Sequence, residues 1–502
     1  MRGGWFSLSE RVRGRVRHHA RLVARAGACL FVVHALAGCF LDIEKPDPRL
    51  DVPDSYVTAR KGPDSALPPL DWWRSFRSHE LSLLMEEAQT ANLDIAAAVA
   101  RIEQADAAVR TANAALLPIL DFNSSATRSL ASTAGGGGGT GGGSAHTLYN
   151  VNLQASYTLD FWGKNRAALL AADENAISSR YAKDVVALTT LVSVANAYFN
   201  VLSAQDRLDI ARDNLKAARR ILTAIDDRFK AGTASELDTS QQESLLAQVQ
   251  ATIPPLEILL RQNKVALAVL VGRAPEHFIL RGGGTRRIAI PRVAPGLPSD
   301  LISQRPDIRE AEANLRSANF SVEVARDAFF PTISLTGETG FESLALRSLF
   351  GPGAWFYTMA ASATQPIFHG GALIAALEQA KGRQLELLQD YRKAVLSGFS
   401  DVEQALIAVQ QQALHERYQQ QAERAAKKAF DVVDRRMKGQ IVDIVTLTQT
   451  QQTWFTARDT LAQVRLARLQ AVVTLYQALG GGWSPPESKA PAAPTPDVVP
   501  NP

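Results

Sequence analysis

A segment in which a helix is followed by a proline and a strand occurs twice in this chain. Residues 94–122 and 307–335 match without a gap at a constant offset of 213 residues. Each copy runs for more than twenty residues without Gly or Pro and then reaches two large apolar residues and a Pro. Pro cannot continue a helix and disfavours helical conformation in its predecessor, so each helix should end there. The identical pairs include Asp94/Asp307, Ile95/Ile308, Val109/Val322 and Pro118/Pro331. This repetition indicates a protein made by tandem duplication.

The residues after each proline alternate as a half-buried strand does. Between Tyr149 and Phe161, odd positions are apolar and even positions are polar, which is typical of a strand. We expect one hairpin per repeat, with strands at about 119–131 and 148–161 and at about 332–342 and 355–365. Strands of this length can cross a bilayer. Four strands cannot close a barrel, and an open edge in lipid leaves backbone groups unpaired. Several copies must therefore pool their strands.

Long helices are predicted beside these hairpins. A helix over 79–117 should lead to the first strand, and residues 164–230 contain no Gly or Pro; at ~1.5 Å per residue they form a helix of roughly 100 Å. The second repeat should have its own long helix at 372–438. Alternating spacings of three and four residues predict coiled-coil packing. The apolar seam comprises Val201, Ala204, Leu208, Ala211, Leu215, Ala218, Leu222 and Ile225.

Return helices are expected after each long helix, at 236–272 and 443–479. The pair Pro254-Pro255 should kink or break the first of them. The first repeat then covers 71–275 and the second 298–483, joined by a Gly-, Arg- and Pro-rich link at 276–297. We interpret the run GGGGGTGGGS at 135–144 as an exposed loop, because the Gly-Lys-Ser/Thr of a phosphate loop does not follow it.

The chain begins with an export signal. Seven Arg residues precede a short apolar stretch, Ala26–Gly38, that ends in Leu-Ala-Gly before Cys39. Residues 1–38 resemble a bacterial lipoprotein signal, in which Cys39 becomes the lipid-bearing first residue. Phe40 after this Cys favours the outer membrane. Residues 39–70 should form a tether, and the Pro/Ala-rich residues 484–502 a disordered tail.

Charge and cysteine content follow from this processing. The whole chain has a net charge of +4, but residues 1–38 carry seven Arg and one Glu, so the mature chain has a net charge of −2. The high isoelectric point is therefore no evidence for nucleic-acid binding. Cys29 leaves with the signal and Cys39 is acylated, so no disulfide can form. No run of eighteen apolar residues is present, and we expect membrane crossing by strands alone.

Three motifs resemble signatures of one family. They are LPSDLISQRPDIREAE at 297–312, LYQALGGGW at 475–483, and PLE at 255–257 with LVGRAP at 270–275. With the duplication and the lipoprotein signal, they are similar to the TolC-like outer-membrane factors, in particular the lipoprotein branch of tripartite, RND-type efflux systems. The resemblance spans roughly 55–483. It implies a mainly α protein with a transmembrane β-barrel: a homotrimer whose twelve strands form one outer-membrane barrel, continued by a twelve-helix periplasmic cylinder.

The resemblance also implies partners and sites. Cargo would pass from an inner-membrane RND-type transporter, through a periplasmic adaptor, into the cylinder and out to the exterior. The adaptor would contact the helix turns around Gly232 and Gly439. Relatives often carry Leu-Asp-Ala-Gln-Arg where this chain has residues 448–452, TQTQQ. Gln449 and Gln452 would then line the periplasmic aperture, with Asp443 the nearest acidic residue; alternatively, both Gln residues are ordinary surface amides.

Other functions remain open at this stage. The same fold could serve as the duct of a type I protein secretion system, although the lipoprotein signal and the C-terminal motif favour efflux. A lipid-anchored periplasmic coiled-coil scaffold would explain the helices but leaves the four strands unexplained. An enzyme is the least favoured class because no HExxH, GxSxG or Cys/His cluster is present. We expect no cofactor beyond the lipid on Cys39.

Overall fold

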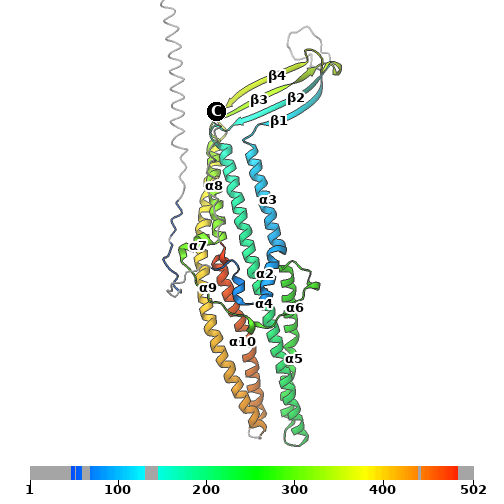
Figure 1. Cartoon of the computed structure of the whole chain (residues 1–502), viewed down its shortest axis with the longest axis vertical. Coiled ribbons are helices and arrows are strands. Elements are labelled where there is room, and N and C mark those ends of the chain that lie inside the picture. Colours follow the sequence, from blue (N-terminus) through cyan, green and yellow to red (C-terminus); the bar gives the residue numbers. More distant parts are fainter. Residues whose placement is uncertain (1–46, 51, 59–67, 131–144, 439–441, 484–502) are drawn as a thin grey trace, which may run out of the picture. The chain divides into compact units, whose positions relative to one another are not determined.

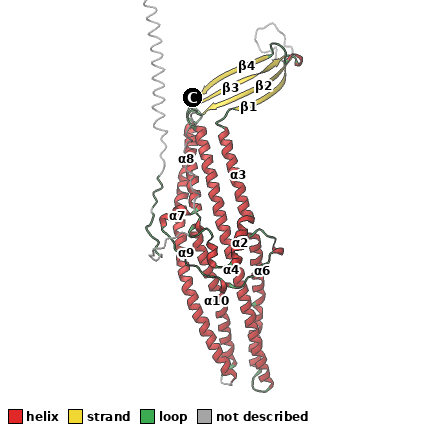
Figure 2. Cartoon of the chain, in the orientation of Figure 1, coloured by secondary structure: helices red, strands yellow, loops and turns green. Residues whose placement is uncertain are grey.

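The computed structural model describes residues 47–50, 52–58, 68–130, 145–438 and 442–483. The signal peptide, Cys39, the Gly-rich loop and the C-terminal tail predicted from the sequence lie outside these residues. The described chain is mainly helical and has one antiparallel sheet (Figures 1 and 2). Its helices are α2 (His79–Ala91), α3 (Leu93–Ala114), α4 (Lys164–Lys230), α5 (Glu236–Ala251), α6 (Ile253–Leu270), α7 (Pro298–Gln304), α8 (Pro306–Asp327), α9 (Ala372–Lys438) and α10 (Ile444–Ala478). Short 3-10 turns occur at Trp72–Phe76, Pro275–His277, Thr285–Arg287, Leu346–Ser348 and Gly480–Gly482.

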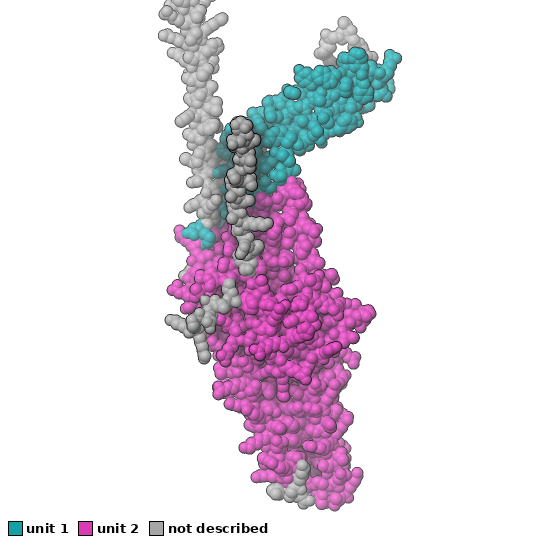
Figure 3. All heavy atoms as spheres, in the orientation of Figure 1, with its two compact units in different colours: residues 1–48, 112–171, 318–386 teal, residues 49–111, 172–317, 387–502 magenta. Residues whose placement is uncertain are grey.

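The chain divides into two compact units that cut across the repeats (Figure 3). One comprises residues 1–48, 112–171 and 318–386, and the other comprises residues 49–111, 172–317 and 387–502. The first unit contains the strands of both repeats. The second contains most of the helices of both repeats. Each compact unit therefore needs residues from both copies of the duplicated sequence.

The sheet of the first unit joins the two hairpins. Its strands are β1 (Ile119–Ser129), β2 (His146–Leu159), β3 (Thr332–Ser343) and β4 (Trp355–Thr364), all antiparallel and in the order β1-β2-β3-β4. The pairing of Tyr149 with Ser343 begins the β2–β3 register that links the repeats. Beyond the strands, Trp162 stacks on Phe330 with ring centroids 4.9 Å apart, and its Nε1 donates to the Pro331 carbonyl at 2.8 Å.

The two faces of this sheet differ in polarity. Paired residues share a face in an antiparallel sheet, so the alternation in β2 extends to its neighbours. On one face Asn150 donates to Glu342 at 3.2 Å, and Asn152 donates to Glu338. The opposite face includes Tyr149, Val151, Leu153, Tyr357 and Met359. The sequence prediction of two alternating hairpins is therefore confirmed.

Two of the predicted helices are each divided in two. The helix expected over 79–117 breaks at Asn92, whose Oδ1 accepts hydrogen bonds from the backbone N–H of Asp94 at 2.9 Å and of Ile95 at 3.1 Å. This is an N-cap, and it starts α3 as a separate helix. The predicted return helix 236–272 ends as α5 at Ala251, and α6 begins at Ile253 with proline in its first turn. This second break confirms the effect expected of Pro254-Pro255.

The predicted seam on α4 is largely buried in the second unit, but Leu215 and Leu222 are only half-buried. Val201, Ala204, Leu208, Ala211, Ala218 and Ile225 are all buried. Near the C-terminal end, Ile221 is buried instead of Leu222. Ile221 and Ile225 pack against Phe430 of α9 and Ile444 of α10, whereas Leu208 and Ala211 pack against Leu256 of α6. The buried face of α4 therefore changes where its neighbours change.

An aromatic cluster closes the core of the same unit. Trp72 and Phe76 are fully buried, and the Trp72 ring stacks on Tyr476 with centroids 5.0 Å apart. Leu191, Val194, Phe199 and Leu202 of α4 belong to the same cluster. This core explains why α4 contains one window with a mean hydropathy of 1.7, apolar enough by length and composition to cross a membrane; 56% of the window is buried. The window is not an unbroken apolar run, because polar residues such as Thr189, Thr190 and Ser193 interrupt this part of α4.

A buried carboxylate joins α9 to α10 and to the link between the repeats. Glu416 is 1% exposed and accepts hydrogen bonds from Arg465, at 2.9 Å, and from Arg468. Arg465 also donates to the backbone carbonyls of Thr285 at 3.1 Å and Ile288 at 3.2 Å. Burial alone would raise the pKa of Glu416, but the hydrogen bonds and charges of the two Arg residues lower it below its ordinary value of 4.5.

We expect Glu416→Gln to destabilise the protein by about 2 kcal/mol at pH 7, because it leaves two Arg side chains without their carboxylate. A group with a lowered native pKa stabilises above its unfolded pKa and loses this effect as the pH falls through its native pKa. The difference in Tm between wild type and variant should therefore be full at pH 7 and shrink below about pH 4.5. Thermal melts followed by circular dichroism measure it. Glu378→Gln, at an exposed position of α9, is the control, and a Tm difference independent of pH would contradict the prediction.

Candidate functional site

The first helix turn predicted as a contact site is a Gly-capped reversal at the end of α4. Gly232 has φ +73°. Its N–H donates to the Phe229 carbonyl at 2.9 Å, and the Thr233 N–H donates to the Arg228 carbonyl at 2.8 Å. This pair of bonds is a Schellman motif, which favours Gly at the left-handed position. No atom lies within 4 Å of an added Cβ, so the backbone conformation, and not a lack of space, requires glycine here.

The structure brings the ends of α4, α9 and α10 together. The Arg228 guanidinium donates to the Met437 carbonyl at 3.1 Å, joining the end of α4 to the end of α9. We call the apolar contacts beside this bond the tip cluster. Its buried members are Ile221 and Ile225 of α4, Phe430 of α9, and Ile444 and Leu447 of α10. Gly439, the centre of the second predicted turn, lies outside the described residues.

Asp443 begins α10 as its N-cap. Its carboxylate accepts from the Thr446 N–H at 2.7 Å and from the Thr446 hydroxyl at 3.2 Å. These hydrogen bonds lower the pKa of Asp443, since they favour its charged form. Asp443 therefore has a local structural role in starting α10, which the sequence analysis did not assign to it.

The two predicted aperture amides share one side of α10. Gln449 and Gln452 are three residues apart and both exposed, so they neighbour each other on the helix surface. Gln451, between them, is 0% exposed. The side-chain hydroxyls of Thr448, Thr450 and Thr453 bond to backbone carbonyls of their own helix, at 2.8–3.0 Å. This turn of α10 therefore carries two solvent-exposed amides, Gln449 and Gln452, on one side and the buried amide of Gln451 on the other.

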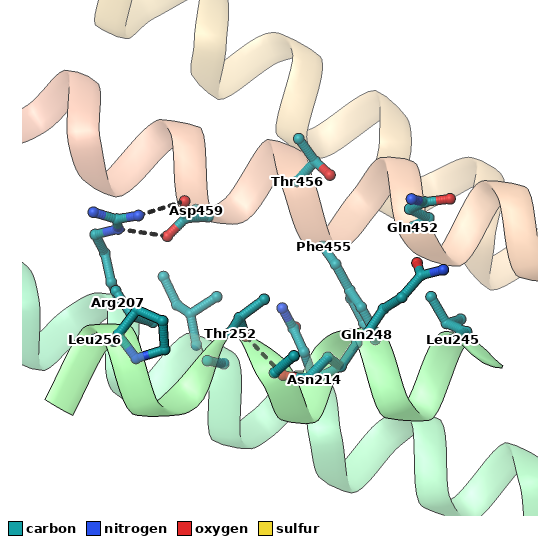
Figure 4. A pocket seen from close by; sticks show the side chains of 15 residues that line it. Arg207, Asn214, Leu245, Gln248, Thr252, Leu256, Gln452, Phe455, Thr456 and Asp459 are labelled. Carbon is teal, nitrogen blue, oxygen red and sulfur yellow. Dashed lines mark hydrogen bonds and ion pairs between the residues drawn. The ribbon is translucent and has the colours of Figure 1, made fainter. Parts of the chain in front are cut away.

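A cavity of about 550 Å³ adjoins this stretch, between α4, the α5–α6 break and α10 (Figure 4). Leu245 and Leu256 contribute apolar wall from α5 and α6, and Phe455 and Gln452 contribute from α10. At one end Arg207 donates to both carboxylate oxygens of Asp459, at 2.7 and 3.1 Å. A bidentate pair of this kind fixes both side chains and leaves little net charge. The cavity is therefore amphipathic and close to neutral.

Sequence reasoning missed the ion pair and the buried Gln451. The residues of the Arg207–Asp459 pair are far apart in sequence and belong to no recognised motif. Gln451 lies four residues after Leu447 and four before Phe455, both buried, and this spacing is the one signal that could have identified it.

Comparison with known proteins gives consistent matches. The sequence profile of a family described as "Outer membrane efflux protein" matches residues 84–273 and 297–481. The pyoverdine export outer membrane protein OpmQ of Pseudomonas putida is 37% identical over 421 residues, covering 83% of this chain and 89% of the relative. OpmQ of Pseudomonas aeruginosa is 36% identical over 460 residues, covering 91% and 96%.

Solved structures match over most of the chain. The open state of the Neisseria gonorrhoeae MtrE outer membrane channel has a TM-score of 0.77 at 29% identity, covering 88% of this chain and 97% of that one. The Campylobacter jejuni CmeC outer membrane channel has a TM-score of 0.82, covering 88% and 95%. At 23% identity, the second match shows the fold alone.

We expect Gly232→Ala to loosen the end of α4 by about 1 kcal/mol, because alanine pays a steric cost at positive φ. Hydrogen exchange of the amides near Arg228 measures this loosening directly. Gly232→Asn is the matched control, since Asn tolerates the left-handed region better, and it should fall between wild type and Ala. Equal exchange in Ala and Gly proteins would show that the turn does not depend on this conformation.

Proposed function

The chain belongs to the outer membrane efflux protein family and has the fold of TolC-like outer-membrane channels, and from this premise we propose that it is the exit duct of a tripartite efflux pump. In this role a homotrimer conducts small molecules passively from an inner-membrane RND-type transporter and a periplasmic adaptor to the exterior. The duct makes and breaks no bonds, so it is not an enzyme and needs no cofactor for transport.

The observation that carries this proposal is the architecture of the sheet. It has one polar and one largely apolar face, and β1 and β4 lie at its two edges. In a bilayer the apolar face suits lipid and the polar face suits a water-filled lumen. Edge backbone groups must be paired when lipid surrounds them. Joining β4 of one subunit to β1 of the next satisfies both edges and encloses a pore.

Exposed apolar residues near the helix turns support the adaptor contact. Phe229, Leu237 and Val445 are 47%, 64% and 54% exposed. Large apolar side chains gathered at one end of a helical body are typical of a protein-binding surface. We propose that the adaptor binds around Gly232 and Gly439, and that Gln449, Gln452 and Asp443 lie at the periplasmic aperture.

The cargo is proposed to be a small molecule. The two OpmQ relatives are named for pyoverdine export, and SrpC of Pseudomonas putida, 29% identical, is named for solvent efflux. These names favour small-molecule efflux over protein secretion. We further propose that Cys39 carries a covalent lipid, such as palmitate, that anchors the mature chain to the outer membrane.

The duct is tested by conductance. The purified mature protein should run as a trimer in mild detergent and form ion-conducting channels in planar bilayers, because only a shared barrel can enclose a pore. Deletion of the gene should sensitise cells to exported compounds, and the plasmid-borne wild type should restore resistance. A protein that stays monomeric, or never conducts, would rule out the duct.

The aperture assignment is tested by charge. Gln449→Asp should raise the cation-to-anion permeability ratio by about fivefold, as expected for an ion–carboxylate interaction of about 1 kcal/mol in water. Gln449→Lys is the matched opposite and should lower the ratio. Reversal potentials in a salt gradient give both values. If neither variant shifts the reversal potential, Gln449 is not at the constriction.

The lipid anchor is tested at Cys39. Mass spectrometry of the mature wild type should find an N-terminal cysteine bearing acyl chains, and Cys39→Ser should lack them because serine offers no thiol to the acylating enzymes. The Cys29→Ser variant is the control and should be processed normally. An unacylated wild-type N-terminus would refute the anchor.

A further inference from the structure

A polar layer interrupts the apolar packing near the ends of the helices. The tip cluster lies on one side of it. On the other side is a second cluster, in which Leu245 and Val249 of α5 and Phe455 of α10 are buried together, with Leu215 of α4 packed against them. Between these clusters along the chain lie Ala218 of α4, Gln242 of α5 and Gln451 of α10, each 0% exposed. The two buried amides thus lie between two apolar clusters that share α4 and α10, and Trp454 of α10 packs against both clusters.

These amides are poorly matched to their surroundings. Gln242 Nε2 donates to the Ala218 carbonyl at 3.2 Å. Among the described residues, no side chain or backbone group forms a hydrogen bond with Gln242 Oε1 or with either polar atom of the Gln451 side chain. Removing an amide from water without a compensating hydrogen bond costs free energy. The arrangement of α10 observed here is therefore destabilised at this layer.

A rotation of α10 costs less at this layer than at the apolar clusters beside it. Residues 448–453 read TQTQQT, six uncharged polar residues in succession. At about 100° per residue they surround the helix completely, so no orientation of this turn exposes an apolar side chain. The threonine hydroxyls bond within the helix, and rotation does not break those bonds. A roll of α10 would bring Gln451 to water and redirect Gln449 and Gln452. It would also move Leu447 and Phe455, which are buried on the same face.

We propose that the buried layer of Gln242 and Gln451 positions the aperture by lowering the free energy needed to move α10 out of its packed orientation. Gln451 is the positioning residue, and it acts through the direction of Gln449 and Gln452. The effect on the aperture rests on the proposed function. The buried layer is observed in the structure and does not depend on that function. A polar group inside an apolar helix seam is known to set packing geometry at a cost in stability.

The test replaces Gln451 with Met, which has a similar shape and no amide. Tm of the purified trimer should rise by about 2 °C or more, because the packed orientation no longer contains unmatched polar atoms. In planar bilayers, transitions between conductance levels should become about fivefold rarer, since only one orientation is stabilised. Gln451→Leu should act in the same direction. Gln250→Met, the same change at an exposed position of α5, should change neither quantity.

Each other outcome counts against the proposal. A Tm that is unchanged or lower would show that the Gln451 amide is satisfied in the protein, for instance by water. A higher Tm with unchanged transitions would limit Gln451 to stability and remove the positioning role. Failure of both variants to form trimers would show that the amide is required for assembly. The Tm measurement does not need a conducting protein. If the wild type never conducts, the duct is refuted, but the Tm of the variants still tests whether the buried amides destabilise the packing of α10.

Discussion

The apolar stripe on α4 must be buried, and most of the packing in the second unit covers it. In proteins most of the stability of a helix comes from packing its apolar face, and α4 presents such a face along much of its 67 residues. Leu208 and Ala211 pack against Leu256 of α6, whereas Val201 and Leu202 enter the aromatic core with Trp72. Helices of both repeats converge on this single stripe, which explains why the compact units do not follow the duplication.

The helices and strands were accessible to sequence analysis because their signals are local. Proline at positions 118 and 331 ends each helix, and period-2 alternation identifies each strand within two residues of its observed bounds. The break at Asn92 was missed because it depends on a partner: Asn92 Nδ2 donates to the Leu270 carbonyl, 178 residues away. The family resemblance was carried by motifs in the link and at the C-terminus, and the profile and structural matches confirm it.

Some residues of the candidate site could be predicted from the sequence and others could not, for different physical reasons. Gly232 could be recognised because a helix that reverses direction favours glycine at its end. Gln451 was not recognised as buried, because in a run of polar residues only its spacing from Leu447 and Phe455 distinguishes it from Gln449 and Gln452. The ion pair of Arg207 and Asp459 required the fold itself.

The strand order has a consequence for how this chain folds. Each hairpin closes a short loop, so β1–β2 and β3–β4 can pair early when the chain folds. The pairing of β2 with β3 instead connects Tyr149 to Ser343, with α4 to α8 between them. Contacts of such large sequence separation form slowly, because a long loop must close before they contribute. Pairing within each hairpin should therefore precede the β2–β3 pairing that joins the two repeats into one sheet.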